Sequence, residues 1–232
     1  DYVIPDFSVL RETAPHLGAL LLTHGHEDHI GAVPFLLREL DIPIYGTRLT
    51  LGLLRHRLAE HGLEATARLF PIARDARFRV GNFDVEAFPV CHSIPDAVGY
   101  VLRCPEGIFV HTGDFKIDPY PLDGVPTGVE RLRAISAAEG ITALFSDSTN
   151  VEREGVSPPE KFVGEALAEI FGQAPGRVVV AMFSSNLHRI QEAIKAAYAC
   201  GRRVALCGKS MVRNVATAID LGYLALPSPD IL

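Results

Sequence analysis

The chain shows two patterns of hydrophobic and polar positions, and the change between them lies near residue 150. Before it, short apolar runs typical of strands alternate with stretches in which apolar residues recur at helical spacing. We predict a buried strand over residues 19–22 and helices over 30–40 and 51–61. Further strands are predicted within 77–90, where two of them meet at Gly81-Asn82, and over 100–103, 108–111 and 143–145.

The second pattern begins after a charged segment that ends in Ser157-Pro158-Pro159-Glu160. These residues match a capping box with proline in the first turn, so a helix is expected from Ser157 to about Phe171. Strands are then predicted over 177–183 and 203–207, and helices over 187–200 and 211–221. Strands that alternate with helices favour a parallel sheet. We therefore expect one domain over residues 1–152 and a second, truncated domain over 153–232.

Composition places the chain among globular proteins. Of its 232 residues, 48% are hydrophobic and 22% are charged, which excludes a disordered tail, a collagen-like chain and a coiled coil. No apolar run approaches the ~20 residues that cross a bilayer, and the first residues lack the pattern of a signal peptide. The four cysteines form no Cys-x-x-Cys pair, which favours a reduced, cytoplasmic setting. A net charge of −6 argues against a generally basic nucleic-acid surface but not against one local basic groove.

Four potential metal ligands lie within six residues directly after the first predicted strand: His24, His26, Asp28 and His29. Imidazole nitrogens together with a carboxylate oxygen suit Zn²⁺ or Mn²⁺. On an extended segment, His24 and His26 face the same side because they are two residues apart. Asp28 and His29 turn away from them, which favours two metal ions over one. The alternative is a histidine-rich loop exposed to solvent.

The segment that holds these residues, Thr-His-Gly-His-Glu-Asp-His-Ile-Gly, resembles the second motif of the metallo-β-lactamase superfamily. His92, within Pro-Val-Cys-His-Ser-Ile-Pro-Asp, resembles the lone histidine of the third motif, and Asp114, within Thr-Gly-Asp-Phe-Lys, resembles the aspartate of the fourth. These contexts, together with Ser-Asp-Ser-Thr-Asn at 146–150, are similar to the ribonuclease J family in the β-CASP branch. The resemblance covers nearly the whole chain.

The resemblance implies an α/β fold: the αββα sandwich of the metallo-β-lactamase domain, followed by the beginning of a β-CASP parallel α/β domain. It also implies two divalent ions, one held by His24, His26 and His92, the second by Asp28 and His29, with Asp114 bridging both. The ions would be Zn²⁺ or Mn²⁺, and Mg²⁺ is a candidate for supporting activity.

Asp147 resembles the acidic motif of the β-CASP branch, whose histidine partner we expect beyond Leu232. Its alternative role is that of a turn or cap residue. Together with Asp28, His29 and Asp114, it completes the set of catalytic candidates. The early aspartate of the superfamily's first motif is expected before Asp1.

The function implied by the resemblance is that of a metal-dependent ribonuclease, which hydrolyses phosphodiester bonds of single-stranded RNA with a hydroxide activated by two ions. The family acts as a 5′-to-3′ exonuclease with endonuclease activity, prefers a 5′-monophosphate, and works in mRNA decay and rRNA maturation. A cytoplasmic homodimer or homotetramer without membrane contact is implied as well.

Phe183, Ser184, Ser185 and Asn186 end a predicted strand and open a predicted helix, where free backbone N–H groups suit a phosphate. The pattern alone also fits ordinary N-capping by serine or asparagine. The family resemblance implies that this segment binds RNA, because the β-CASP domain there faces the RNA channel. Lys116 is interpreted as either close to a phosphate or an ordinary surface lysine. Four histidines without a motif context are interpreted as surface or packing residues: His16, His56, His61 and His111.

Two other classes of function were weighed against this one. A small-molecule hydrolase, such as a lactonase or a thioesterase, could use the same metal scaffold, but it has no reason to carry the strands and helices after residue 157. A non-catalytic RNA-binding protein with a degenerate site is disfavoured because all six ligand positions hold residues of a suitable type.

Overall fold

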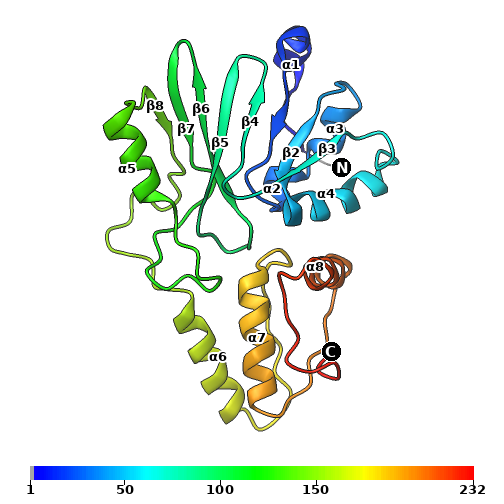
Figure 1. The fold of residues 1–232 in the computed structure, drawn as a ribbon. Helices are drawn as coiled ribbons and strands as arrows, with labels where there is room; N and C mark the ends of the chain where they lie inside the picture. Colours follow the sequence, from blue (N-terminus) through cyan, green and yellow to red (C-terminus); the bar gives the residue numbers. More distant parts are fainter. Residues whose placement is uncertain (1–2) are drawn as a thin grey trace. The chain divides into compact units, whose positions relative to one another are not determined.

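The computed structural model describes residues 3–232, which form two compact units (Figure 1). The first unit consists of residues 3–90, Asp96–Asp114 and Gly128–Asp147, and the second consists of Cys91–Pro95, Phe115–Thr127 and Ser148–Leu232. The domain boundary between residues 152 and 153 stays a prediction. Within residues 3–232, no helix combines the length and the apolar character needed to cross a membrane.

Two β-sheets build the first unit. The smaller one has the order β1-β2-β3, and its parallel strands are Leu20–Leu21, Ile44–Thr47 and Leu69–Ile72. The larger one has the order β4-β5-β6-β7-β8, formed by Arg77–Val80, Phe83–Pro89, Val98–Cys104, Gly107–His111 and Ala143–Phe145. Its strands are antiparallel as far as β7, whereas β8 runs parallel to β7.

The core of the first unit lies between the two sheets. Buried residues of the larger sheet meet Leu21 and Ile72 of the smaller one, and they are Val85, Ala87, Val98 and Tyr100. On the other side of the smaller sheet, Leu36 of α3 (Val33–Leu37) packs with Leu20. Helix α5 (Val129–Ala138) lies beside β7 and β8, and its Arg131 bonds to Glu86 on the outer face of the larger sheet (Figure 1). This succession of layers confirms the predicted αββα sandwich.

The strands predicted within 77–90 and those predicted over 100–103 and 108–111 form two hairpins. Gly81, with a φ of 54°, lets β4 turn directly into β5, so that Val80 pairs with Phe83. The hairpin of β6 and β7 closes with Cys104 opposite Gly107. Strand β8 covers the predicted residues 143–145, whereas only Leu20–Leu21 of the first predicted strand enters a ladder.

The helix predicted over 30–40 is divided and begins earlier. Helix α2 covers Glu27–Ile30, and α3 follows at Val33–Leu37. Pro34 cannot donate a hydrogen bond to the carbonyl of Ile30, and its ring would clash with that carbonyl in a continuous helix. Helix α4, Arg48–Glu60, confirms the second predicted helix with a start before residue 51. A short helix, α1 (Ser8–Glu12), and a 3₁₀ turn, η1 (Ala14–His16), precede β1.

The described part of the second unit contains helices α6 (Lys161–Gln173), α7 (Leu187–Ala199) and α8 (Lys209–Asp220). Helices α6 and α7 pack through Phe171, Ala196 and Ala197. Helices α7 and α8 confirm the two predicted helices in this region.

The predicted N-cap of α6, Ser157, is wrong, because the helix begins four residues later at Lys161. The Oδ2 atom of Asp118 accepts the N–H of Glu160, the residue before the helix, at 3.1 Å. Lys116 donates to the carbonyl of Pro158 at 2.6 Å. Residues 158–160 are thus held by a segment about forty positions away, and neighbouring residues in the sequence carry no sign of it.

The strands predicted over 177–183 and 203–207 are wrong, since neither segment forms a β-ladder in the part of the chain that the structure describes. Val204 donates its N–H to the carbonyl of Ile231. Val178 and Val204 are partly buried against the core of α6 and α7, whereas Val179, Val180 and Phe183 are exposed. An apolar run in these segments therefore predicted neither a paired strand nor full burial.

Candidate metal centre

The loop after β1 is held by both sheets of the first unit. Leu22 donates its N–H to β2, and its carbonyl accepts the hydroxyl of Tyr100 at 2.7 Å. The N–H of Val98 donates to the carbonyl of Thr23 at 2.9 Å. The next side chain, that of His24, is completely buried. The alternative of a loop exposed to solvent therefore does not hold for His24.

His24 and His26 bring two ring nitrogens together. Nε2 of His24 lies 3.1 Å from Nδ1 of His26, and the ring centroids are 4.7 Å apart. Two nitrogens bound to one tetrahedral zinc ion at about 2.0–2.1 Å are about 3.3 Å apart. The observed separation fits a shared ion as well as an N–H···N hydrogen bond. The extended backbone of His26 (φ −71°, ψ 152°) agrees with the expectation that both rings share a side.

Asp114 directs its two carboxylate oxygens toward two different imidazoles. Oδ2 lies 3.9 Å from Nε2 of His24, and Oδ1 lies 3.3 Å from Nε2 of His29. His24, His26 and Asp114 each offer one ligand atom within 4.8 Å of the others. Neutral imidazoles together with a carboxylate form a donor set that fits Zn²⁺ or Mn²⁺. A carboxylate placed between two imidazoles in this way suits two neighbouring cations.

Helix α2 carries the other two candidate ligands of this loop. The ring of His29 lies against that of His24, with centroids 4.0 Å apart. The Oδ2 atom of Asp28 lies 3.7 Å from Nε2 of His29, on a side chain that is 78% exposed. Asp28, His29 and Asp114 thus form a second group of potential metal ligands, next to the group of His24, His26 and Asp114. Their role as ligands stays a prediction.

The turn before Asp114 requires a glycine. Gly113 has a φ of 60°, and a Cβ at this position would lie 2.8 Å from the Cβ of Thr23. Because nothing larger than hydrogen fits between them, Gly113 brings the backbone before Asp114 against the residue that precedes His24.

Two threonines that sequence reasoning missed support the site. Oγ1 of Thr23 lies 3.1 Å from Nδ1 of His24. With Nε2 as the metal-binding nitrogen, Nδ1 carries the proton and donates it to Thr23. Thr112 uses its Oγ1 to accept the N–H of Asp147 at 3.1 Å. The sequence signals these roles only by a threonine close to a candidate ligand. It does not indicate to which atom the hydroxyl forms a hydrogen bond.

Asp147 follows β8 as Asp114 follows β7. These two strands are parallel neighbours, with His111 opposite Phe145 at their ends. Because the carboxyl ends of parallel neighbours meet at the same edge of a sheet, both aspartates lie at that edge. The catalytic role of Asp147 stays a prediction.

His92 lies in the segment Cys91–Pro95, which belongs to the second unit. Within this unit, Cys91 donates its N–H to Oγ1 of Thr127 at 2.9 Å, and its carbonyl accepts the N–H of Lys116 at 2.8 Å. Burial raises the pKa of the Cys91 thiol to about 11, so it stays neutral and is a poor metal ligand. His92 itself is partly buried, and its role as a ligand stays a prediction.

Lys116 is a structural residue in the second unit. Its Nζ donates to the carbonyl of Pro158 and lies 3.4 Å from Oδ2 of Asp118. Although burial alone would raise the pKa of Asp118, the N–H groups of Tyr120 and Glu160 and the charge of Lys116 lower it. These contacts occupy the ammonium group of Lys116, which is only 23% exposed and therefore not the ordinary surface lysine of the second interpretation.

The predicted RNA-binding segment lies at the start of α7. Phe183 is 84% exposed, and Ser184 accepts hydrogen bonds from Asn214 at its carbonyl and its hydroxyl. Asn186 caps the helix, because its Oδ1 accepts the N–H of Arg189 at 3.2 Å. The capping alternative thus describes the Asn186 side chain, and RNA binding by Phe183, Ser184, Ser185 and Asn186 stays a prediction.

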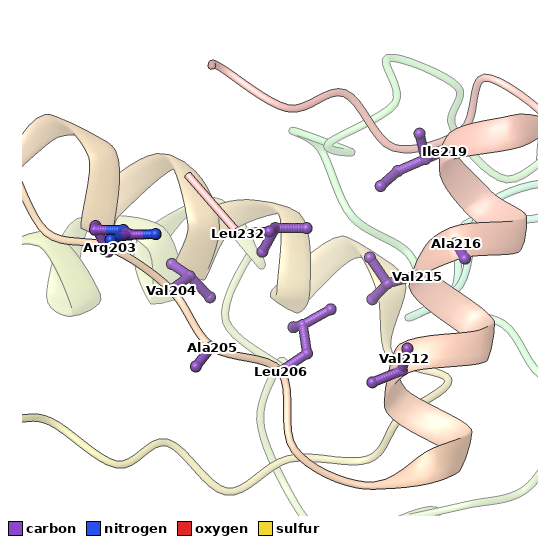
Figure 2. A pocket seen from close by; sticks show the side chains of 9 residues that line it. All are labelled: Arg203, Val204, Ala205, Leu206, Val212, Val215, Ala216, Ile219 and Leu232. Atoms are coloured by element: carbon purple, nitrogen blue, oxygen red, sulfur yellow. The ribbon is translucent and has the colours of Figure 1, made fainter. Parts of the chain in front are cut away.

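The second unit also contains an apolar cavity of about 620 Å³ between residues 203–206 and α8 (Figure 2). Val204, Leu206, Val215 and Ile219 are among the residues that line it, and Arg203 is the charged one. Such a lining offers no ligand for a divalent cation. The cavity is therefore not a candidate for the metal centre.

Comparison with protein families agrees with the geometry of the first unit. Residues 3–182 match the beta-lactamase superfamily domain. Residues 175–232 match the beta-CASP domain of ribonuclease J. A crystal structure of a protein of unknown function from Enterococcus faecalis V583 superposes with a TM-score of 0.64 at 19% identity, over 90% of this chain and 50% of that one, which shows a shared fold.

Curated relatives are similar over nearly the whole chain. Ribonuclease J of Thermus thermophilus is 48% identical over 97% of this chain and 40% of its own length. Ribonuclease J 1 of Streptococcus pyogenes is 42% identical over 98% of this chain and 40% of its own length. Ribonuclease J of Mycolicibacterium smegmatis is also 42% identical, over 100% of this chain and 41% of its own length. The chain thus spans about 40% of the length of these relatives.

Proposed function

Because the chain belongs to the beta-lactamase superfamily, we propose that it contributes the metal-binding part of a ribonuclease of the ribonuclease J type. The observation that carries this proposal is the carboxylate of Asp114, which faces His24 at 3.9 Å and His29 at 3.3 Å with different oxygens. The relatives named ribonuclease J, which match 97% or more of the chain, support RNA as the substrate.

We assign one cation to His24, His26 and His92, a second to Asp28 and His29, and Asp114 to both. Two observations support His92 as a ligand. Its side chain is of a metal-binding type, and its segment, residues 91–95, is joined at both ends to residues of the first unit, Val90 and Asp96. The N–H of Val90 donates to the carbonyl of Ala97, which closes the base of this loop next to β5. Zn²⁺ or Mn²⁺ fits this donor set, with Mg²⁺ as a candidate for supporting activity.

Two divalent cations, when bound, supply a nucleophilic water at neutral pH and stabilise charge on the attacking and leaving oxygens of a phosphodiester. The protein's own residues prepare the site for them. When Nε2 of His24 binds the cation, Oγ1 of Thr23 accepts the remaining Nδ1–H, and the shared carboxylate of Asp114 offsets part of the cationic charge. Asp147, at the same sheet edge, is assigned a catalytic role. The remaining positive charge attracts the phosphate of RNA although the chain is acidic overall.

For the substrate, we further propose single-stranded RNA with a 5′-monophosphate, degraded in the 5′-to-3′ direction with additional endonuclease activity. The exposed ring of Phe183 suits stacking on a base, and Ser184, Ser185 and Asn186 offer hydrogen-bonding groups beside it. The proposed setting is mRNA decay and rRNA maturation in the cytoplasm, by a homodimer or homotetramer.

The test uses the protein at its natural length and RNA that carries a 5′-monophosphate and a label at the 5′ end. With Mn²⁺ or Mg²⁺ present, we expect release of labelled mononucleotide. His26→Ala and Asp114→Asn each remove a proposed ligand and should lower the rate by at least about 100-fold. His16→Ala, at an exposed position in η1, is the matched control and should cleave like the unaltered protein.

Two outcomes contradict the proposed ribonuclease site, and a third contradicts only the proposed exonuclease direction. Intact RNA after incubation with metal-loaded protein would exclude the ribonuclease and direct the search to lactones and thioesters. Equal cleavage by His26→Ala and the unaltered protein would place the activity outside this site. Shorter labelled fragments without mononucleotide would keep the ribonuclease but overturn the proposed exonuclease direction.

A further inference from the structure

We propose that His111 is a positioning residue for Asp114, which it aims by accepting the backbone N–H of Gly113. This inference rests on the proposed function, because it assumes that Asp114 binds the cations. The sequence offers no motif for His111, and its interpretation there was that of a surface or packing residue. The structure assigns it a specific hydrogen bond instead.

His111 is the last residue of β7, where it pairs with Tyr100 on one side and Phe145 on the other. Its ring lies parallel to that of Phe145, with centroids 6.5 Å apart and an angle of 21° between the planes. Both side chains are exposed. A ring contact this long and this exposed contributes little as packing alone, so the polar atoms of the imidazole are the more informative feature.

Nδ1 of His111 accepts the N–H of Gly113 at 3.0 Å. A bond from a side chain to the N–H two residues later has the pattern of an Asx turn, in which Asn or Asp holds the backbone in a tight bend. The bond also fixes the tautomer, because an accepting Nδ1 carries no proton. Gly113 is buried, so this bond satisfies a backbone donor that water does not reach.

The direction of Asp114 depends on this bend because its neighbours are fixed in other ways. Thr112 donates its N–H to the carbonyl of Phe145 at 3.0 Å, which extends the pairing of β7 with β8 by one residue. Gly113 is then the one residue between this anchor and Asp114. It adopts a φ of 60° and lies against the Cβ of Thr23. Since glycine has the widest conformational freedom, only its contacts hold it there.

Without the acceptor on His111, the N–H of Gly113 loses its partner, and the bend is held only by the bond from Oγ1 of Thr112 to the Gly113 carbonyl and by the contact with Thr23. The two oxygens of Asp114 then no longer face His24 and His29 at the same time, and cation binding weakens although every ligand is present. Supporting groups behind metal ligands commonly change affinity by about 10–100-fold.

The test uses the natural-length protein and two variants of His111, one that keeps a hydrogen-bond acceptor and one that keeps only an aromatic ring. His111→Asn keeps an acceptor that forms the same turn, whereas His111→Phe keeps the stacking on Phe145 and removes the acceptor. Zn²⁺ affinity is measured by competition with a chromophoric chelator, and thermal unfolding of the metal-free protein is measured in parallel. We expect His111→Phe to bind Zn²⁺ about 10-fold more weakly and His111→Asn to remain within about 3-fold. The metal-free His111→Phe protein should stay folded and melt a few degrees lower, because the buried N–H of Gly113 loses its acceptor.

Two further variants separate the possible failures. Asp114→Asn must weaken Zn²⁺ binding, and if it does not, the proposed function loses its central ligand. If Asp114→Asn weakens binding but His111→Phe does not, the role of His111 is refuted and the proposed function stands. Phe145→Leu removes the ring contact alone and should bind Zn²⁺ normally, so a loss equal to that of His111→Phe overturns the inference in favour of packing. Should His111→Phe not fold, His111→Val replaces it as the variant without an acceptor.

Discussion

Glu86 is a buried carboxylate on the outer face of the larger sheet, and it accepts hydrogen bonds from two arginines. Arg131 donates to it at 2.6 and 3.0 Å, and Arg103 donates at 2.9 Å. The Arg131 bonds, together with those of Arg103 and the charge of Arg77, lower the pKa of Glu86 from 4.5 to about 2 against the opposing effect of burial. The group therefore links β5 to β6 and α5 most strongly in its ionised form.

This shift predicts how the stability of the protein depends on pH. A carboxyl group with a lowered pKa contributes stability above its unfolded pKa of 4.5, and this contribution disappears as the pH falls toward 2. Protonation of Glu86 alone should lower the free energy of unfolding by about 2 kcal/mol as the pH falls from 5 to 3. Glu86→Gln should be less stable by about 2–3 kcal/mol at pH 7, and the difference from the unaltered protein should narrow in acid.

Urea unfolding between pH 7 and pH 3 measures this difference, in the presence of EDTA so that metal release does not contribute. Glu106→Gln, in the exposed turn between β6 and β7, is the matched control and should follow the unaltered protein. If the Glu86→Gln protein lost stability in acid as steeply as the unaltered protein, Glu86 would not be the group that titrates.

At the scale of elements, α4 is capped by a residue far away in the sequence. The N–H of Leu49 in the first turn donates to Oδ2 of Asp96 at 3.3 Å, and Oγ1 of Thr47 donates to the Asp96 carbonyl at 2.8 Å. Asp96 adopts a φ of 66°, a conformation that aspartate and asparagine tolerate better than most residues. The helix thus begins at Arg48 because a loop from the other sheet supplies its cap.

Because Asp96 caps α4, we expect two substitutions of Asp96 to lower the stability of the protein by different amounts. Asp96→Ala removes the acceptor and places a Cβ-bearing residue without a polar group at positive φ, which should cost about 2 kcal/mol. Asp96→Asn keeps an acceptor and tolerates this φ, so it should cost less than about 1 kcal/mol. Urea unfolding at pH 7 measures both, with Asp75→Ala in an exposed turn as the control. Equal losses for the alanine and asparagine variants would contradict the assignment of Asp96 as a cap.

The elements also show which features of this protein can be predicted from sequence. The hairpin of β4 and β5 and helix α7 follow from local signals, namely Gly81-Asn82 as a turn and Asn186 as a helix cap. The start of α6 does not, because Glu160, the residue before the helix, is held by Asp118 from another segment. The segments 177–183 and 203–207 carry a strand pattern without a ladder, since pairing depends on a partner that local sequence does not encode.

The same distinction applies to the site. His24 and His26 could be paired from their spacing, because two residues on one extended segment share a side whatever the fold. Asp114 was assigned by its resemblance to a family motif, and the fold then places it beside His24. Thr23, Thr112 and His111 act through contacts with particular atoms, so only the structure distinguishes them from ordinary polar residues.

At the scale of the whole molecule, the candidate site contains residues of the first unit that are distant from one another in the sequence. His24 and His26 follow β1 of the smaller sheet, whereas Asp114 follows β7 of the larger one. A cation bound by ligands from both sheets is bound only by the folded protein, since the unfolded chain does not hold these residues together. Binding must therefore stabilise the fold in proportion to the logarithm of the free metal concentration.

We accordingly expect Zn²⁺ to raise the melting temperature of the natural-length protein and EDTA to reverse the change. At a free concentration of about 100 times the dissociation constant, one site contributes about 2.7 kcal/mol, which corresponds to roughly 5–10 °C for a domain of this size. His26→Ala should lose most of this increase, whereas His16→Ala should retain it. If both variants gained as much as the unaltered protein, Zn²⁺ would be acting at another site, and the link between the two sheets through His26 would be excluded.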